Sequence, residues 1–204
     1  MLNLDHIALG ANDLNAASKK LIQMLGVEPF GGGEHELFAT HNKLWRIETP
    51  EYPIYMELIA ANKAAKPQRP VWFGLGNSFP DDEIQLLGFI ASTANIEQDV
   101  QTPPFDALEL IEVSRGKLAW QFGVTKDGSL PADGALPYLI NWHGNKRPLD
   151  GVKPQGIDLV SMGGARLAEL GGDWPVDVDE AASKREKFFV ELSCAKNQRL
   201  CFSR

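Results

Sequence analysis

His6 and Glu57 are the two side chains whose types and positions best fit a metal-binding or catalytic site. Each lies in a short apolar stretch with the pattern of a strand, residues 4–9 and 54–60. Neighbouring strands lie ~4.8 Å apart, so two side chains on one face can share a metal ion at ligand distances of ~2.0–2.2 Å. An imidazole with a carboxylate suits Zn, Fe, Ni or Mn. Without a metal, the same pair would be a buried histidine hydrogen-bonded to a glutamate.

His35 is the third candidate, because it follows the run Gly31-Gly32-Gly33. We interpret this run as a bend whose backbone could approach a ligand closely. His35 would then be a third metal ligand or a general acid/base near physiological pH, or it would only anchor the turn. Of these residues, Glu57 and His35 are our candidate catalytic groups. The run lacks the lysine and the glycine spacing of a phosphate-binding loop.

Strand alternation decides what surrounds His6. A two-residue period places Leu4, His6 and Ala8 on one face, and Asp5 and Ile7 on the other. We expect the face with Ile7 to be core and the face with His6 to line a cavity. An amphipathic helix follows, with Asn12 or Asp13 as its cap, helically spaced apolar residues from Leu14 to Leu25 and a stop at Gly26.

The same order of elements occurs twice, so the chain is predicted to be α+β and built from paired βαβββ modules. In the first module, residues 1–61, further strands are expected at 27–30, 43–48 and 54–60. Residues 62–86 are predicted to be a linker with a short helix that begins near Pro80. In the second module, residues 87–145, we expect strands at 88–94, 107–113, 117–125 and 138–142, and a helix at 95–101.

The remaining segment, residues 151–204, is predicted to be a partial third module of one domain that spans residues 1–204. We expect strands near 157–162, 188–194 and 199–202, and helices near 166–170 and 179–187. The two cysteines, Cys194 and Cys201, are seven residues apart and are predicted to be buried reduced thiols.

Aligning the two modules shows which of them can carry the chemistry. Asn12-Asp13-Leu14 aligns with Ala94-Asn95-Ile96, which places Gly88 opposite His6. Pro53 and Pro137 align in turn, which places Asn141 opposite Glu57. Because the second module lacks both ligands, we expect the first module to hold the site.

Composition excludes several classes of protein. The chain has 204 residues, of which 44% are hydrophobic and 23% charged, as is ordinary for a globular protein. Its net charge of -7 offers no basic footprint for nucleic acid or for an anionic membrane. No apolar run reaches the ~20 residues that span a bilayer, and the first residues lack a signal-peptide pattern, so a cytoplasmic protein is expected.

Several of these segments resemble the vicinal oxygen chelate superfamily, which includes glyoxalase I, bleomycin-resistance proteins and extradiol dioxygenases. They are the opening Leu4-Asp5-His6-Ile7-Ala8-Leu9 with Asp13-Leu14, and Tyr55-Met56-Glu57-Leu58-Ile59. Residues 32–42 are similar to the Gly-Gly-x-His-x-x-x-Gly-Thr-x-Asn segment of a glyoxalase-like family, with Ala39 in place of its third glycine. Residues 136–142, from Leu136 to Trp142, are similar to a later segment of that family.

The resemblance implies a fold and a chemistry. The fold would be a curved mixed-sheet cup, the glyoxalase/bleomycin resistance fold, with an additional partial module at its C-terminal end. A divalent metal, with His6, Glu57 and His35 as ligands, would chelate two adjacent oxygens of a small metabolite in a lyase, isomerase or dioxygenase reaction. Candidate substrate-binding residues are Thr40, Asn42, Arg46, Asn141 and Trp142.

Two other interpretations stay open. A metal-free cup could bind or sequester a small apolar or aromatic molecule, as bleomycin-resistance proteins do. A cup filled by its own side chains would instead serve as a dimerising scaffold. The expected partner is therefore a small molecule, and the expected state is a monomer or a homodimer.

Overall fold

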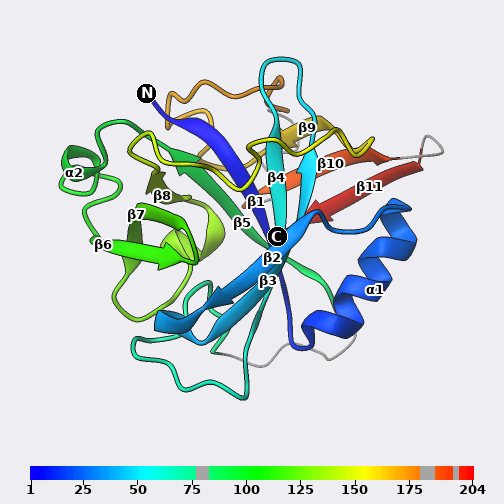
Figure 1. Ribbon diagram of the computed structural model, residues 1–204. Helices are drawn as coiled ribbons and strands as arrows, with labels where there is room; N and C mark the ends of the chain where they lie inside the picture. The colour runs from blue at the N-terminus through cyan, green and yellow to red at the C-terminus, as the bar shows by residue number, and fades with distance from the viewer. Residues whose placement is uncertain (77–82, 180–186, 195–197) are drawn as a thin grey trace.

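The computed structural model contains an eight-stranded sheet that curls around an interior and a separate three-stranded sheet (Figure 1). It describes residues 1–76, 83–179, 187–194 and 198–204. In those parts of the chain, no helix has the length and apolar character needed to cross a membrane.

The first module runs from β1 to β4. Its elements are β1 (Asn3–Ala11), α1 (Leu14–Leu25), β2 (Gly31–His35), the 3-10 helix η1 (Glu36–Phe38), β3 (Thr40–Ile47) and β4 (Ile54–Ala61). The second module repeats this order with β5 (Gln85–Ser92), α2 (Ile96–Asp99), β6 (Leu108–Arg115), β7 (Leu118–Thr125), the 3-10 helix η2 (Pro131–Gly134) and β8 (Tyr138–Asn141). The three-stranded sheet consists of β9 (Asp158–Gly163), β10 (Phe189–Cys194) and β11 (Gln198–Ser203).

The two modules join along their first strands. The strand order is β2-β3-β4-β1-β5-β8-β7-β6, so β1 and β5 are neighbours and β2 and β6 are the outer strands. β1 runs parallel to β4, β5 runs parallel to β8, and β1 and β5 are antiparallel. The predicted fold of paired βαβββ modules in a curved mixed sheet is confirmed, and the additional C-terminal residues form the three-stranded sheet.

Helix α1 forms where the sequence predicts it. The carboxylate of Asp13 caps it by accepting hydrogen bonds from the backbone N–H groups of Asn15 and Ala16 at 2.8 and 3.0 Å. Gly26 ends it with a left-handed φ of 75°, a conformation that costs glycine little. Leu21 and Leu25 are fully buried from solvent, so the apolar stripe of the helix packs into the core.

Two apolar clusters occupy the two faces of the large sheet. One includes side chains of α1, alternate residues of β1 such as Ile7 and Leu9, and apolar residues of the three-stranded sheet. The other lies inside the cup and is largely aromatic, with Trp72, Phe73 and Trp120 among its members. The second cluster surrounds the pocket described below, so the sheet separates a purely structural core from the candidate site.

The glycine run is a strand and not a bend, which corrects the prediction from sequence. Gly31 begins β2, and Gly33 pairs with Asn42 on β3, whereas no strand forms at residues 27–30. Pairing with β3 outweighs the low strand propensity of glycine, because the backbone hydrogen bonds of an outer strand need no side chain.

Three further predictions differ from the structure or fall outside the residues it describes. Residues 165–170 form consecutive turns instead of the helix expected near 166–170. β5 begins at Gln85, inside the segment predicted as a linker. The helix expected near Pro80, and most of the one expected at 179–187, lie outside the described residues.

Cys194 and Cys201 are not joined by a disulfide. Cys194 is buried, as predicted, but Cys201 is exposed. β11 is an outer strand of the three-stranded sheet, and alternation along it turns Leu200 and Phe202 into the core and Cys201 outward.

Candidate functional site

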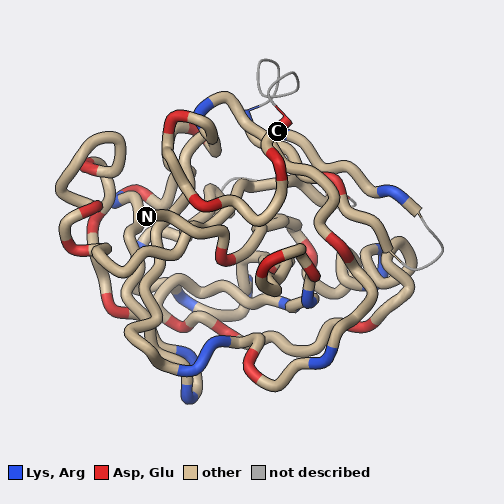
Figure 2. Tube along the Cα trace, turned by 90° about the horizontal axis from the view of Figure 1, so that it is seen from above, with Lys and Arg blue, Asp and Glu red and all other residues tan. Residues whose placement is uncertain are grey.

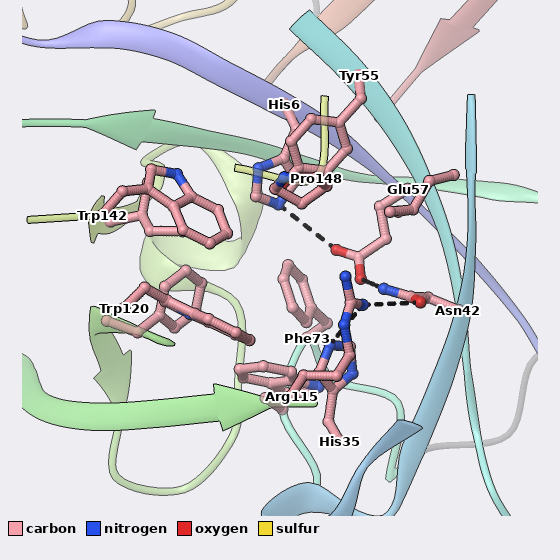
Figure 3. A pocket seen from close by; sticks show the side chains of 14 residues that line it. His6, His35, Asn42, Tyr55, Glu57, Phe73, Arg115, Trp120, Trp142 and Pro148 are labelled. Carbon is pink, nitrogen blue, oxygen red and sulfur yellow. Dashed lines mark hydrogen bonds and ion pairs between the residues drawn. The ribbon is translucent and has the colours of Figure 1, made fainter. Parts of the chain in front are cut away.

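A narrow pocket with a free volume of about 20 Å³ lies inside the cup. Both modules contribute to its wall. Its polar side chains are His6, His35, Asn42, Glu57 and Arg115, and its aromatic side chains are Tyr55, Trp72, Phe73, Trp120, Phe122 and Trp142 (Figure 3). A few polar groups that converge in an apolar concavity are typical of a small-molecule site.

His6 and Glu57 meet in this pocket. β1 and β4 are parallel neighbours in which His6 lies opposite Tyr55, and Glu57 is two residues further along the same face of β4. Nε2 of His6 lies 3.5 Å from Oε2 of Glu57, and the two residues are 4% and 5% exposed. The Tyr55 ring stacks on the His6 ring at a centroid distance of 4.3 Å, which fixes the orientation of the imidazole.

Asp5 is a further partner of His6. The alternation in the sequence wrongly placed Asp5 on the opposite face of the strand. The register between β1 and β5 shifts between Leu4 and His6, so a bulge turns the Asp5 carboxylate toward the pocket wall. Its Oδ1 accepts a hydrogen bond from Nδ1 of His6 at 2.8 Å. Its Oδ2 accepts from Trp142 at 3.0 Å and from Arg147 at 2.9 Å. A bulge of one residue cannot be recognised from the apolar and polar alternation of a single sequence, so the position of Asp5 could not be predicted.

The three buried groups Asp5, His6 and Glu57 set one another's charge. Burial alone would lower the pKa of His6, but hydrogen bonds to Asp5 and Glu57 outweigh it, and the pKa is raised. Burial alone would raise the pKa of Glu57, but the hydrogen bond and charge of His6 lower it to about 2. The pKa of Asp5 is lowered in the same way, chiefly by its hydrogen bond to His6. The raised pKa of His6 and the lowered pKa values of Asp5 and Glu57 all favour an imidazolium between two carboxylates.

His35 lies on the other side of the pocket and is neutral. Burial lowers its pKa to about 4, and its residue is only 3% exposed. Nε2 faces the guanidinium of Arg115 at 3.3 Å and so accepts a hydrogen bond. Nδ1 then carries the proton and donates to Oγ1 of Thr40 at 3.1 Å, an oxygen that also accepts from Trp72 at 2.9 Å.

Arg115 and Asn42 connect the two histidines through Glu57. The amide nitrogen of Asn42 donates to Oε1 of Glu57, and its oxygen accepts from Arg115 at 2.9 Å. Figure 3 shows the guanidinium of Arg115 between the His35 ring and the pair of Glu57 and Asn42. Arg115 was not predicted from the sequence, because it ends β6 and reaches the pocket only when the cup brings β6 against β2.

The predicted substrate-binding residues divide into two groups. Asn42 and Trp142 line the pocket, and Thr40 supports His35 from behind. Arg46 instead pairs with Glu48 through two contacts of 2.6 and 3.1 Å, outside the pocket. Asn141 binds the carbonyl oxygen of Ala94 at 3.3 Å and is not among the lining residues.

The donor set fits a divalent metal only in part. Within the described parts of the chain, no group of at least three His, Cys, Asp and Glu side chains is arranged to hold a metal. Nε2 of His6 and Oε2 of Glu57 are two suitable donors, and Asp5 orients His6 as carboxylates do behind metal-bound histidines. His35 directs its free nitrogen at the Arg115 cation instead. A metal on this pair would need water or substrate oxygens as its other ligands.

Comparison with known proteins agrees with this architecture. A family model described as a glyoxalase-like domain matches residues 4–173, most of the chain. The chain belongs to this glyoxalase-like family. The family lies in the glyoxalase/bleomycin resistance superfamily, as the resemblance in sequence implied. No curated protein sequence matches the chain.

Several solved structures of similar fold are methylmalonyl-CoA epimerases. One, in complex with methylmalonyl-CoA and NH4+, is 18% identical over 72% of the glyoxalase-like chain and 99% of its own, with a TM-score of 0.50. A Streptomyces coelicolor variant in complex with 2-nitronate-propionyl-CoA is 19% identical over 72% and 100%, with a TM-score of 0.49. The enzyme from Mycobacterium tuberculosis is 15% identical over 67% and 84%, with a TM-score of 0.43. The first of these, at 18% identity and a TM-score of 0.50, shows a shared fold.

Proposed function

We propose that this chain is an enzyme that moves a proton on a small oxygen-bearing metabolite, with His6 and Glu57 as the reacting pair. The observation that carries the proposal is their contact: two groups of opposite charge, 3.5 Å apart, buried in a pocket with apolar walls. Titratable groups whose pKa values are pushed apart in this way are a common feature of acid/base sites.

The pair is suited to a coupled transfer. His6 would donate the proton on Nε2 to an oxygen of the substrate, while Asp5 holds the ring through Nδ1. His6 is also what keeps the pKa of Glu57 low, because burial alone would raise it. As His6 gives up its proton, the Glu57 carboxylate becomes a stronger base toward a hydrogen on the neighbouring carbon.

A divalent metal remains part of the proposal, because members of this superfamily commonly use one. His6 and Glu57 would then be its protein ligands through Nε2 and Oε2, in place of their role as the proton-transfer pair. Bound there, a metal would supply a Lewis acid for the substrate oxygen. Asp5 would then serve to orient His6, and Arg115 and Asn42 would keep their places beside Glu57.

The first test asks whether the chain transfers protons at carbon. Purified protein is incubated in D2O with a panel of small 2-oxo and 2-hydroxy acids, aldehydes and ketones, and proton NMR follows exchange of the hydrogen beside the oxygen-bearing carbon. We expect exchange of at least one compound by wild-type protein and its loss in His6→Asn. If wild-type protein, with and without added metal, exchanges none of them, the proposal is wrong.

A second test concerns the metal. Protein loaded with Zn, Fe, Ni or Mn and then desalted is assayed by elemental analysis. We expect about one bound ion per chain in wild-type protein and its loss in His6→Ala and Glu57→Ala, with Arg46→Ala as the control outside the pocket. Equal retention by all four proteins would place the ion elsewhere.

A binding protein is the second candidate function. The observation that favours it is the aromatic part of the pocket wall. The ring centroids of Trp120 and Trp142 lie 5.3 Å apart there, in the same pocket as His6 and Glu57. Such a wall could hold a flat apolar molecule without reaction. In that case, an aromatic ligand would raise the unfolding temperature of metal-free protein, and His6→Asn would leave the rise unchanged.

A further inference from the structure

Arg115 enters the site across a glycine of the opposite module. A Cβ atom built on Gly33 would lie 2.8 Å from Cδ of Arg115 and 3.2 Å from its Nε. A side chain at position 33 would force the stem of Arg115 to move. The gap between the outer strands β2 and β6 is therefore filled by the stem of Arg115, and it is open to that stem because residue 33 has no side chain.

Among the described residues, one nitrogen of the Arg115 guanidinium, NH1, has hydrogen-bonding partners. NH1 donates to Asn42 at 2.9 Å and faces His35 at 3.3 Å. Neither Nε nor NH2 makes a hydrogen bond or ion pair with the residues that the structure describes, and no carboxylate among those residues pairs with Arg115. The Nε–NH2 edge of a guanidinium is one that carboxylates bind through two parallel hydrogen bonds.

The position of Arg115 fits a ligand that enters the pocket. Arg115 lines the inner pocket and also a larger groove outside it, so its charge lies at the boundary between the two. Inside that boundary, six of the fourteen lining residues are aromatic, and His6 and Glu57 also line the wall. A molecule with one carboxylate at its outer end and an apolar body would match both surfaces.

We propose that Arg115 is a carboxylate-binding residue and that the substrate is a small monocarboxylic acid. Its carboxylate binds Nε and NH2 of Arg115, its apolar body lies against the aromatic wall, and its oxygen-bearing carbon lies toward His6 and Glu57. This inference rests on the proposed function for the orientation of the ligand. The binding of the carboxylate itself does not depend on that function.

The outer groove limits the charge of the ligand. Its lining includes the three carboxylates Glu34, Glu36 and Glu112. A polyphosphate tail that passed through this groove would meet like charges on both sides. The site is thus suited to an acid with one negative charge and not to a polyphosphorylated ester.

The test compares an acid with its uncharged ester. 3-Phenyllactate and methyl 3-phenyllactate are titrated into the full chain, and binding is followed by tryptophan fluorescence and calorimetry, since three tryptophans line the pocket. We expect wild-type protein to bind the acid about 10- to 100-fold more tightly than the ester, as loss of a bidentate charged pair predicts. Arg115→Met should remove this preference, and Arg115→Lys should retain part of it.

A matched glycine pair tests the same idea with the charge kept. Gly33→Ala pushes the stem of Arg115 aside, whereas Gly31→Ala on the same strand adds a methyl group with no atom within 4 Å. We expect Gly33→Ala to weaken binding of the acid several-fold and Gly31→Ala to leave it unchanged. Thermal unfolding of both variants checks that they fold.

Each outcome bears on the proposal. Equal affinity of acid and ester, an unchanged preference in Arg115→Met, or no binding of either compound at millimolar concentration would overturn it. Tighter binding of inorganic phosphate than of 3-phenyllactate would overturn the carboxylate class. His6→Asn separates this inference from the proposed function: acid binding that persists in His6→Asn, without proton exchange by wild-type protein, supports the carboxylate site and rejects the enzyme.

Discussion

At the scale of single residues, the site depends on how buried charges compensate one another. Asp5, His6 and Glu57 are each almost completely buried, and an isolated charge in any of these places would be costly. A protonated His6 offsets the free-energy cost of burying both carboxylates. Arg147 and Trp142 donate hydrogen bonds to the remaining oxygen of Asp5. Changing one member of the network should therefore move the pKa of the others.

Asp5→Asn tests this coupling. Asp5 is the main partner that raises the pKa of His6, so the pKa of His6 should fall in the variant. The free energy of unfolding should fall by about 2 kcal/mol, because hydrogen bonds to a charged group are lost. NMR titration of the His6 ring and urea unfolding measure the two effects. Asp106→Asn, at an exposed position, is the control, and an unchanged His6 pKa in Asp5→Asn would contradict the account.

His35 predicts a dependence of stability on pH. Its pKa is about 4 in the folded protein, below its ordinary value of 6.5, so between these values the unfolded chain binds the proton and the folded chain does not. The groups that face it are Glu57, Arg115, His6 and His41. Stability therefore falls as pH falls from 6.5 to 4, and is fully retained above 6.5.

The size of this effect can be measured against a variant that does not titrate. Between pH 7 and pH 5, wild-type protein should lose about 2 kcal/mol more unfolding free energy than His35→Gln does. Urea unfolding of both proteins at the two pH values gives the difference. If the two proteins lose the same amount, His35 is not held neutral by burial.

At the scale of elements, the three-stranded sheet belongs to the same core as the large sheet. Phe188, which precedes β10, is fully buried and stacks on Phe89 of β5 at a centroid distance of 4.5 Å. Apolar residues of β9, β10 and β11 join the cluster that also contains Ile7 and Leu9 of β1. The C-terminal sheet therefore supports the back of the strand that carries His6.

Phe188→Ala should lower the stability of the whole molecule. Deleting a buried phenylalanine side chain lowers the free energy of unfolding by about 3–5 kcal/mol. Because the two sheets share a core, one cooperative unfolding transition should move to a lower denaturant concentration. Ser203→Ala, at an exposed position of β11, should change little. Denaturant unfolding followed by tryptophan fluorescence and by circular dichroism checks this. Two separate transitions in Phe188→Ala would show that the small sheet unfolds alone.

At the scale of the whole molecule, closure of the cup builds the site from both modules. His6, Glu57, Asn42 and His35 come from the first module, and Arg115 and the tryptophans 120 and 142 from the second. Acidic and basic residues are interspersed along the rest of the chain (Figure 2). The coupled buried charges of Asp5, His6 and Glu57 are thus a feature of the pocket and not of the general charge distribution.

This division also explains what the sequence could predict. Periodicity and caps located most elements, because both are local rules. The contact between His6 and Glu57 was a hypothesis from the sequence, since pairing of β1 with β4 joins distant parts of the chain. Asp5 was missed because a bulge breaks alternation, and Arg115 because its approach to Gly33 depends on closure of the cup. The glycine run was misread because pairing with β3 overrides its propensity.

The most direct test of the central claim is the rate of deuterium exchange at carbon in Glu57→Gln. If Glu57 accepts the proton, exchange of the compound found with wild-type protein should slow by about 100-fold or more. Glu48→Gln, whose carboxylate lies outside the pocket, should exchange at the wild-type rate. A folded Glu57→Gln protein that exchanges as fast as wild type would contradict the account.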